Sequence, residues 1–367
     1  MKTAIVYDRV NKWGGAERVL LALHEVFPDA PLYTSVYDAK KAPWARVFPK
    51  VKSSFLQKLP ILKDHHELLG WLTPLAYESF SFDEYDLVIS VTSEAAKGVI
   101  TKPETLHICL CLTPTRYLWS GYRDYLENPP TKLSWIPFYI YVSRPFLAYT
   151  KIWDKVAAQR PDTYIAISKV VQKRIRKYYG RDSRVIFPPV DVERFKIQDS
   201  RFKKRVYYLV VSRLVPYKKV DLALKAFNEL GLPLVIVGTG SEKGKLKRMA
   251  GKNIRFAGFV NEEELIGYYK NAKALVMPQE EDFGIVAVEA QAAGVPVIAY
   301  KMGGAQDTVI DGKTGLFFAK QTKSDLISCV ESFQKMRFEK SVLIKNAERF
   351  SKERFKSEFL DIVKRNG

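Results

Sequence analysis

The chain has 367 residues, of which 47% are hydrophobic, and it carries a formal net charge of +19. A single hydrophobic core stops growing near roughly 250–300 residues, so this length predicts two domains, and ordinary Gly and Pro contents exclude long disordered tails. The positive charge favours anionic partners: nucleotide sugars, acidic lipid surfaces or nucleic acid.

Short apolar strands alternate with helices through the first half of the chain. The opening strand, 3–7, turns polar at once, so we expect neither a signal peptide nor a membrane anchor. An amphipathic helix is predicted over 16–26, helices and loops over 40–85, and further strands at 32–36, 87–91, 106–112 and 163–167. Near-continuous apolar strands separated by helices are typical of a parallel sheet covered on both faces.

The alternation restarts after an extended, proline-containing strand at 185–191 and a charged bridge at 193–205. Strands are predicted at 206–211, 234–237, 254–256, 274–277 and 295–299, and helices at 220–230, 242–249, 262–271 and 284–294, followed by a long helical tail. Two successive doubly wound α/β sheets predict two Rossmann-like domains, 1–192 and 193–350, facing a central cleft.

In the segment 277–300, MPQEEDFGIVAVEAQAAGVPVIAY, Glu281 and Glu289 bracket seven residues. Glu289 lies in an almost wholly apolar run that predicts a buried helix, where a carboxylate needs a charged or hydroxyl-rich partner. It therefore either pairs with a local arginine or backbone group or binds a ligand. Glu281 precedes this helix, and a phosphate site is predicted beside it at the first amides, those of Phe283, Gly284 and Ile285.

Two cations and three glycine-containing loops follow predicted strands. Arg213 and Lys218 either form a solvated basic turn or point into the crevice where doubly wound sheets bind ligands. The Gly14–Gly15 pair lets the backbone approach a ligand at a helix start, although the spacing is not that of a P-loop. Gly238 and Gly240 form a tight turn or line a pocket, and Val260 and Glu262 follow the next strand.

Two segments of the first half suggest lipid contact as one of two interpretations. The stretch 133–149 is rich in aromatics and predicts either a packed helix or a patch that rests on a membrane. The segment 169–184 interleaves basic residues with tyrosines, which is typical of a solvated helix face but also of a surface for anionic lipid or nucleic acid.

Glu281, Phe283-Gly284, Glu289-Ala290 and Gly294-Val295-Pro296-Val297 closely resemble the signature of retaining glycosyltransferases of family 4, which have the two-domain GT-B fold. The likeness covers nearly the whole chain and is strongest in the second half. Two positions depart from the pattern: Asp282 stands where the family has glycine before the phenylalanine, and Lys219 replaces the glycine after the lysine. The resemblance implies that a final helix, within 351–367, crosses back onto the first domain.

The resemblance also implies roles for the candidate residues. Arg213 and Lys218 would hold the donor diphosphate, Glu281 would orient sugar hydroxyls, and Glu289 would hold the ribose. Donor contacts would also come from Gly14, Gly15, Gly238, Gly240, Val260, Glu262, Phe283, Gly284 and Ile285. The Thr-Pro-Thr-Arg-Tyr segment offers Thr113, Arg116 and Tyr117 to the sugar or the acceptor, but Leu112 stands where related mannosyltransferases have a histidine, so no role is taken from that histidine.

The predicted function is therefore a retaining hexosyltransferase that uses GDP-mannose and a lipid-linked oligosaccharide or polysaccharide acceptor. Neither a cofactor nor a metal is expected, because no metal-ligand spacing of His or Cys and no Asp-x-Asp element occurs. Cys109, Cys111 and Cys329 predict no disulfide framework, so we expect a cytoplasmic protein that can lie on the inner face of the cell membrane. The alternatives are a UDP-sugar donor, a soluble acceptor and, more distantly, a non-catalytic nucleic-acid-binding protein.

Overall fold

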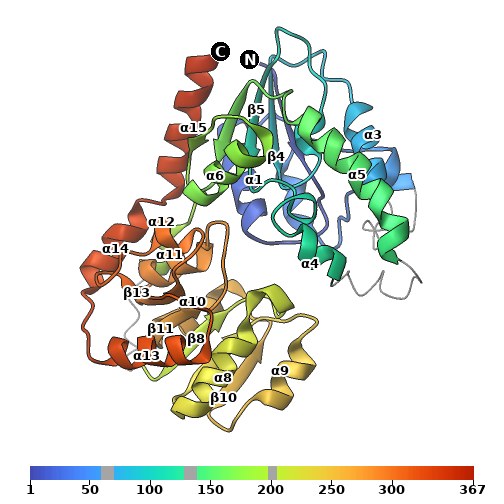
Figure 1. The fold of residues 1–367 in the computed structure, drawn as a ribbon. Coiled ribbons are helices and arrows are strands. Elements are labelled where there is room, and N and C mark those ends of the chain that lie inside the picture. The colour runs from blue at the N-terminus through green and yellow to red at the C-terminus, as the bar shows by residue number, and fades with distance from the viewer. Residues whose placement is uncertain (59–69, 128–138, 197–204) are drawn as a thin grey trace. The chain divides into compact units, whose positions relative to one another are not determined.

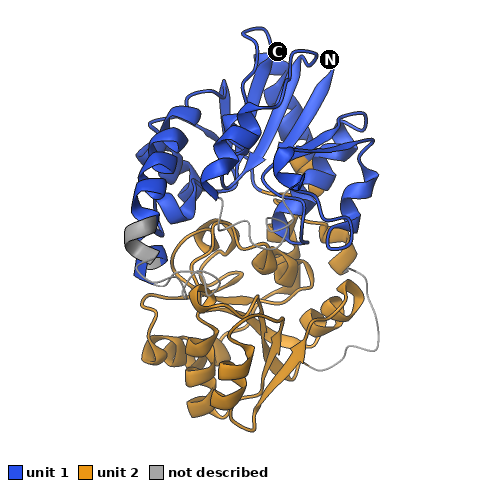
Figure 2. Ribbon diagram, turned by 90° about the vertical axis from the view of Figure 1, so that its right-hand side faces the viewer, with its two compact units in different colours: residues 1–187, 356–367 blue, residues 188–355 orange. Residues whose placement is uncertain are grey.

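The computed structural model describes residues 1–58, 70–127, 139–196 and 205–367. The chain divides into two compact units, which Figure 2 shows in separate colours: unit 1 comprises residues 1–187 and 356–367, and unit 2 comprises residues 188–355. The sequence-based boundaries are residues 192 and 350.

Unit 1 is built on a seven-stranded parallel sheet in the order β3-β2-β1-β4-β5-β6-β7 (Figure 1). Its strands are β1 (Thr3–Tyr7), β2 (Leu32–Thr34), β3 (Val51–Ser53), β4 (Leu87–Thr92), β5 (Leu106–Cys111), β6 (Thr163–Ala166) and β7 (Arg184–Val185). Its helices are α1 (Gly15–Val26), α3 (Thr73–Glu78), α4 (Tyr122–Glu127), α5 (Tyr139–Ala157), α6 (Lys169–Tyr179) and most of α15 (Lys352–Asn366).

The central strands of unit 1 form where the apolar runs predict them. Every residue of β1 and β4 is buried, as expected for a parallel sheet covered on both faces. Strand β3 was not predicted within 40–85, because its sequence, Val-Lys-Ser, is short and only partly buried at the sheet edge. Strand β7 is shorter than the predicted 185–191, since Pro188 and Pro189 cannot donate to a sheet ladder.

Unit 2 is built on a six-stranded parallel sheet in the order β10-β9-β8-β11-β12-β13. Its strands are β8 (Tyr207–Val211), β9 (Leu234–Val237), β10 (Ile254–Gly258), β11 (Ala272–Met277), β12 (Val297–Tyr300) and β13 (Gly315–Phe318). Its helices are α7 (Val192–Lys196), α8 (Val220–Leu230), α9 (Lys243–Met249), α10 (Glu262–Lys270), α11 (Ile285–Ala292), α12 (Ala305–Thr308), α13 (Lys323–Gln334) and α14 (Lys340–Glu348).

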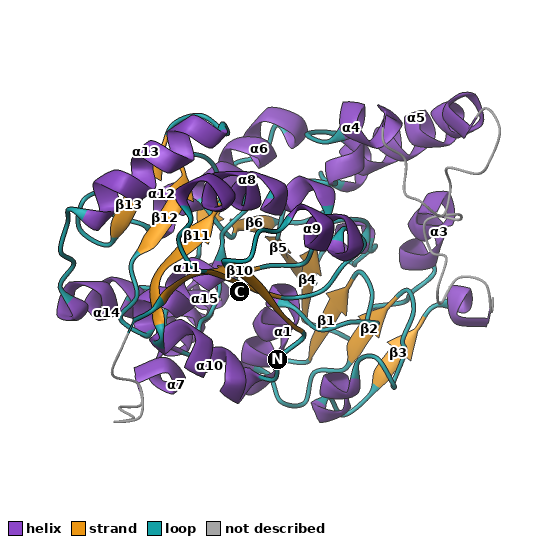
Figure 3. Ribbon diagram, turned by 90° about the horizontal axis from the view of Figure 1, so that it is seen from below, coloured by secondary structure: helices purple, strands orange, loops and turns teal. Residues whose placement is uncertain are grey.

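Helices cover both faces of the second sheet (Figure 3). Helix α8 packs against α13 on one face, whereas α11 packs against α7 and α14 on the other. Strand β13 lies in the region predicted as a helical tail; it has only four residues, Gly-Leu-Phe-Phe, which is too short to show a strand period. The prediction of two doubly wound parallel sheets is confirmed.

The strand order reverses once in each sheet, and this reversal positions the candidate sites. In unit 1 the chain leaves β1 toward β2 on one side and β4 lies on the other; in unit 2 the same holds for β8, between β9 and β11. Connections that leave in opposite directions open a crevice beyond the carboxyl ends of the two strands, where such sheets bind ligands.

A helix that spans a membrane requires a minimum length and a low polarity. Within the described ranges, helices are too short or too polar to cross a bilayer. The aromatic stretch 133–149 is described only from residue 139, where it forms the first part of α5.

Candidate active site

The candidate residues of unit 2 lie at the carboxyl ends of its strands. Arg213 follows β8, Gly238 follows β9, Val260 follows β10 and Glu281 follows β11. These strands are neighbours in a parallel sheet, so their carboxyl ends meet at one edge, beside the reversal between β8 and β11.

Lys218 and Glu281 meet in a direct ion pair, although 63 residues separate them in sequence. The Nζ atom of Lys218 donates to Oε1 of Glu281, and Nε2 of Gln279 donates to the same oxygen at 2.9 Å. Both side chains of the pair are mostly shielded from solvent, with exposures of 12% and 18%. Among the residues that the structure describes, no donor reaches Oε2 of Glu281, so this oxygen is available to a hydroxyl of a ligand.

Tyr217 connects the second predicted cation to this pair. The guanidinium of Arg213 donates to the Tyr217 hydroxyl, and Nζ of Lys218 lies 5.1 Å from the centroid of the Tyr217 ring. Two cations thus contact one aromatic side chain in the loop after β8. Both can donate charge-assisted hydrogen bonds to a phosphate, which are stronger than neutral ones. The sequence analysis did not single out Tyr217; its position between the two cations was the available signal.

A close approach of two loops holds Glu281 at the start of α11. The amide of Gly304 donates to the carbonyl of Glu281 at 2.8 Å. A Cβ atom at Gly303, whose φ is +68°, would lie 2.3 Å from that carbonyl oxygen, and one at Gly304 would lie 2.3 Å from Cα of Phe283. Glycines at both positions are therefore required for this approach. The sequence analysis missed this Gly-Gly pair.

The helix α11 begins directly after Gly284, which has a φ of +84°. The first amides of a helix have no partner within the helix and carry partial positive charge. Glu281 shortly precedes this helix start and contacts Lys218, so the structure places a carboxylate and an ammonium group near a set of amides. Phe283 is buried and packs against Phe350 at a centroid distance of 5.5 Å, so its side chain serves the core.

The loops that follow β8 and β9 touch through backbone atoms. Leu214 N donates to the carbonyl of Thr239 at 2.9 Å. A Cβ atom at Gly238 would lie 1.9 Å from the carbonyl oxygen of Ser212, and one at Gly240 would lie 2.2 Å from that of Leu214. These two glycines are therefore needed to seat the Arg213 segment, whether or not they also contact a ligand.

Glu289 is buried in α11, with 2% of its surface exposed. Its Oε2 accepts a hydrogen bond of 2.8 Å from the hydroxyl of Tyr269, a buried residue that precedes Glu289 by 20 positions in the sequence. A protein partner for Glu289 is thus present; it is a tyrosine hydroxyl, whereas the sequence-based interpretation named a local arginine or a backbone group. The contact of Glu289 with a ribose stays a prediction.

We expect Glu289→Gln to weaken nucleotide binding by roughly tenfold, because an amide cannot replace a charged acceptor for two ribose hydroxyls. Isothermal titration with nucleotide measures this loss. Tyr269→Phe is the matched control, since it removes only the protein partner. If Glu289→Gln and Tyr269→Phe lower the melting temperature alike while nucleotide affinity is unchanged, the role of Glu289 is structural.

The last pair of donor candidates in unit 2 lies at the start of α10. Val260 is partly buried and precedes the capping box of Asn261 and Glu264, in which the two side chains each accept a backbone N–H. Glu262 is exposed and forms an ion pair with Arg194 of α7. Contact of either residue with a base stays a prediction.

In unit 1, Gly14 and Gly15 lie at the start of α1, as predicted. Gly14 caps the helix in an extended conformation, and a Cβ atom there would lie 3.1 Å from Oε2 of the buried Glu17. A Cβ atom at Gly15 would meet nothing within 4 Å. The space beside Gly15 is therefore open, whereas Gly14 is confined by its own helix.

Thr113, Arg116 and Tyr117 belong to the loop after β5. Thr113 is buried, and its hydroxyl accepts a long hydrogen bond of 3.4 Å from Arg174 of α6. Burial raises the pKa of Tyr117 well above its ordinary value. The contacts of these three residues with a sugar or an acceptor stay predictions.

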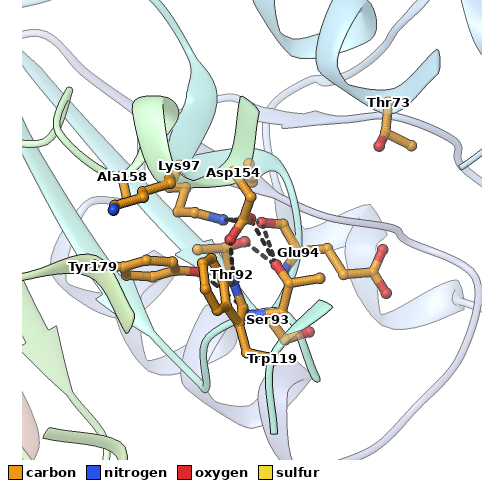
Figure 4. A network of polar contacts seen from close by, with 12 residues as sticks. Thr73, Thr92, Ser93, Glu94, Lys97, Trp119, Asp154, Ala158 and Tyr179 are labelled. Atoms are coloured by element: carbon orange, nitrogen blue, oxygen red, sulfur yellow. Dashed lines mark hydrogen bonds and ion pairs between the residues drawn. The ribbon is translucent and has the colours of Figure 1, made fainter. Parts of the chain in front are cut away.

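A buried ion pair anchors this loop to the helix α5 (Figure 4). Lys97 and Asp154 lie 2.5 Å apart between Nζ and Oδ1, with side-chain exposures of 1% and 2%. Asp154 also accepts hydrogen bonds from Thr115 Oγ1 at 2.8 Å and from Trp119 Nε1 at 2.7 Å. Burial alone would lower the pKa of Lys97, but the Asp154 carboxylate raises it above its ordinary value. This network holds both ends of the Arg116–Leu118 turn.

A second charged group, also missed by the sequence analysis, follows β1. Asp8 is buried and accepts hydrogen bonds from Thr92 Oγ1 and Ser93 N, both at 2.7 Å. Burial and the nearby Glu94 charge raise the pKa of Asp8. Arg9 pairs with Glu94 at 2.5 Å. Two charged residues directly after an apolar strand were the signal that could have identified this group.

Within the described part of the chain, His, Cys, Asp and Glu side chains do not form a group of three that could hold a metal ion. Lys218 and Arg213 are cations that can neutralise a diphosphate.

Residues 191–350 match the family model described as glycosyl transferases group 1. Among curated relatives, a GDP-mannose-dependent alpha-(1-6)-phosphatidylinositol monomannoside mannosyltransferase of Mycolicibacterium smegmatis is 33% identical over 183 residues, 42% of this chain and 48% of that protein. A D-inositol 3-phosphate glycosyltransferase of Streptomyces bingchenggensis is 31% identical over 196 residues, 45% and 43% of the two chains. The chain spans about half the length of the curated relatives it matches.

Solved structures resemble the whole chain. HepE of Anabaena in complex with UDP has a TM-score of 0.71 at 19% identity, with coverage of 99% of this chain and 100% of that one. Sucrose-phosphate synthase of Thermosynechococcus elongatus has a TM-score of 0.71 at 16% identity, with coverage of 100% and 99%. With its sheets of seven and six parallel strands, the chain has the predicted GT-B fold.

Proposed function

We propose that the chain is a retaining hexosyltransferase using a nucleotide-sugar donor, because residues 191–350 match the family model of glycosyl transferases group 1. The observation that carries the proposal is the contact of Lys218 with Glu281 beside the start of α11. Such a site combines groups that bind a departing diphosphate with a carboxylate that binds sugar hydroxyls.

The proposed reaction breaks the bond between the anomeric carbon and the diphosphate and joins that carbon to an acceptor oxygen. Negative charge grows on the leaving diphosphate while the sugar takes on oxocarbenium character. Lys218, Arg213 and the amides at Gly284 and Ile285 stabilise the leaving group, so no metal ion is needed. In this proposal the acceptor's proton passes to the leaving phosphate on the same face, and the configuration is retained.

The ion pair defines how Lys218 and Glu281 share this work. Glu281 uses Oε1 for Lys218 and Gln279, and its Oε2 would accept a sugar hydroxyl. Lys218 donates one of its three N–H bonds to Glu281, so two remain for phosphate oxygens. The pair thus sets the distance between the sugar and the diphosphate without having to break.

The finer proposal is transfer of mannose from GDP-mannose to a lipid-linked oligosaccharide or polysaccharide. This donor is supported by a relative named as a GDP-mannose-dependent mannosyltransferase, whose sequence is 33% identical to this chain over 183 residues. A soluble phosphorylated acceptor is the second candidate, because other relatives are named D-inositol 3-phosphate glycosyltransferases. A UDP-sugar donor would leave the site chemistry unchanged, since the diphosphate and ribose are common to both donors.

Thermal shift measurements with GDP, UDP, ADP and their sugar derivatives, without added metal and with EDTA, test the donor. A ligand that binds only the folded state raises the melting temperature according to its concentration relative to Kd. We expect a selective increase with GDP and GDP-mannose. A UDP-selective increase would change the donor and keep the reaction, whereas the absence of any increase would contradict the proposed site.

A further inference from the structure

Helix α5 buries one face and exposes a mostly apolar one. Leu147, Thr150, Asp154 and Ala157 are buried, at the spacing of a single helix face. The opposite face exposes Tyr149 by 48%, Ile152 by 69% and Val156 by 58%, and Phe146, exposed by 43%, lies at one margin of the buried face beside Trp71. Exposed large apolar side chains that share one helix face mark an interaction surface more strongly than scattered ones.

Basic side chains follow one margin of this apolar face. An α-helix turns by about 100° per residue, so Arg144, Lys151 and Lys155 lie on one side of α5. This side borders the exposed apolar residues Tyr149, Ile152 and Val156. The exposed residues of α5 within the described range 143–157 include no carboxylate, because Asp154 is buried with Lys97. The exposed face of α5 thus combines apolar and positive groups.

The neighbouring elements extend both properties. On one side, α3 runs beside α5: Trp71 lies 5.5 Å from Phe146 between ring centroids, and Trp153 Nε1 donates to Glu78 at 2.8 Å. Leu75 of α3 lies between Trp71 and Glu78 in the sequence and is exposed by 49%.

On the other side, Trp119 joins α5 to the basic helix α6. Nζ of Lys151 lies 4.9 Å from the centroid of Trp119, and Tyr178 of α6 stacks on the same tryptophan at 5.2 Å. Helix α6 exposes Lys169, Lys173, Arg176 and Lys177, and its sequence, Lys-Val-Val-Gln-Lys-Arg-Ile-Arg-Lys-Tyr-Tyr, has no acidic residue. Trp119 thus links the basic margin of α5 to a helix whose exposed side chains include several cations.

We propose that this α5 surface, formed by Leu75, Phe146, Tyr149, Ile152, Val156, Arg144, Lys151 and Lys155, binds the anionic surface of a lipid bilayer. The apolar side chains insert at the level of the headgroups, and the basic margin binds lipid phosphates. A second copy of the chain is disfavoured as the occupant, because two such surfaces would bring like charges together. The inference deepens the proposed function, and rests on it, in explaining how the enzyme reaches a lipid-linked acceptor.

Flotation of the full chain with phosphatidylcholine vesicles, with and without phosphatidylglycerol, tests the proposal. We expect the wild-type protein to float with the anionic vesicles and to be released by high salt, which screens surface charge. The double variant Ile152→Glu/Val156→Glu should raise the apparent Kd for anionic vesicles at least about tenfold, because two inserted apolar side chains become charged. Lys155→Ala should raise it about fivefold.

Val47→Glu is the matched control, since Val47 is 49% exposed on a different element, the Pro43–Val47 turn. Circular dichroism and the nucleotide-induced thermal shift confirm folding of each variant. Equal flotation of the double variant and Val47→Glu, or no wild-type binding to anionic vesicles, would overturn the α5 surface. So would a wild-type dimer that the double variant dissociates.

The two proposals fail in different ways. If the wild-type protein binds nucleotide but does not float, or if the double variant floats as well as the wild type, only the proposal of the α5 surface is contradicted. A protein that floats normally but shows no shift with any nucleotide contradicts the proposed function and leaves the α5 surface in place.

Discussion

Replacing Asp154 by alanine is expected to lower the free energy of unfolding of unit 1 by about 3–5 kcal/mol, because it leaves the ammonium of Lys97 buried without its countercharge. Both side chains are almost completely shielded from solvent. Thr115 and Trp119 lose their acceptor as well. This is a large share of the ~5–15 kcal/mol that stabilises a typical domain.

Tryptophan fluorescence in a denaturant titration measures this loss in the right part of the chain, since all 6 tryptophans fall within the residues of unit 1. Glu84→Ala is the control. It breaks the Lys2–Glu84 pair, whose side chains are exposed by 58% and 53%, and should leave the unfolding midpoint unchanged. Similar midpoints for Asp154→Ala and Glu84→Ala would show that the buried pair is not an anchor of the loop after β5.

Replacing Lys218 by alanine is expected to lower kcat/KM by about 30-fold, equivalent to ~2 kcal/mol of transition-state stabilisation. The ammonium lies on Glu281 and can reach a diphosphate with its remaining donors. The same change frees Oε1 of Glu281 from its cation. Steady-state rates with the donor identified by thermal shift measure the effect.

Lys219→Ala is the matched control for this prediction. It removes the same charge from the adjacent residue, which is exposed. We expect nearly wild-type rates from it. A loss below tenfold for Lys218→Ala, or equal losses for both variants, would count against a contact of Lys218 with the diphosphate.

Predictions from the sequence were most accurate where burial on both sides of a sheet demands continuous apolar runs. The central strands β1, β4, β8 and β11 lie within a residue or two of their predicted ranges. The edge strand β10 was also predicted, but the edge strands β3 and β13 were missed for the opposite reason. The residues of β3 and β13 have too few buried side chains, and too few residues, to show a period.

The candidate site of unit 2 shows the same division. Arg213, Lys218 and Glu281 could be selected from the sequence, because cations and carboxylates directly after apolar strands belong to the edge where such sheets bind ligands. Their contacts could not. The Lys218–Glu281 pair, the position of Tyr217 and the requirement for Gly303 and Gly304 depend on how loops from non-consecutive strands approach one another.

By itself, the sequence determined the fold class, the two doubly wound sheets and the types of chemical group at their strand ends, because periodicity and strand-end positions are local properties. Only the tertiary structure decided that Glu289 shares a hydrogen bond with Tyr269, that Lys97 is buried against Asp154, and that the outer face of α5 is apolar with a basic margin. Each of these depends on which residues, distant in the sequence, exclude water from one another, and charge pairing and burial are set by that exclusion.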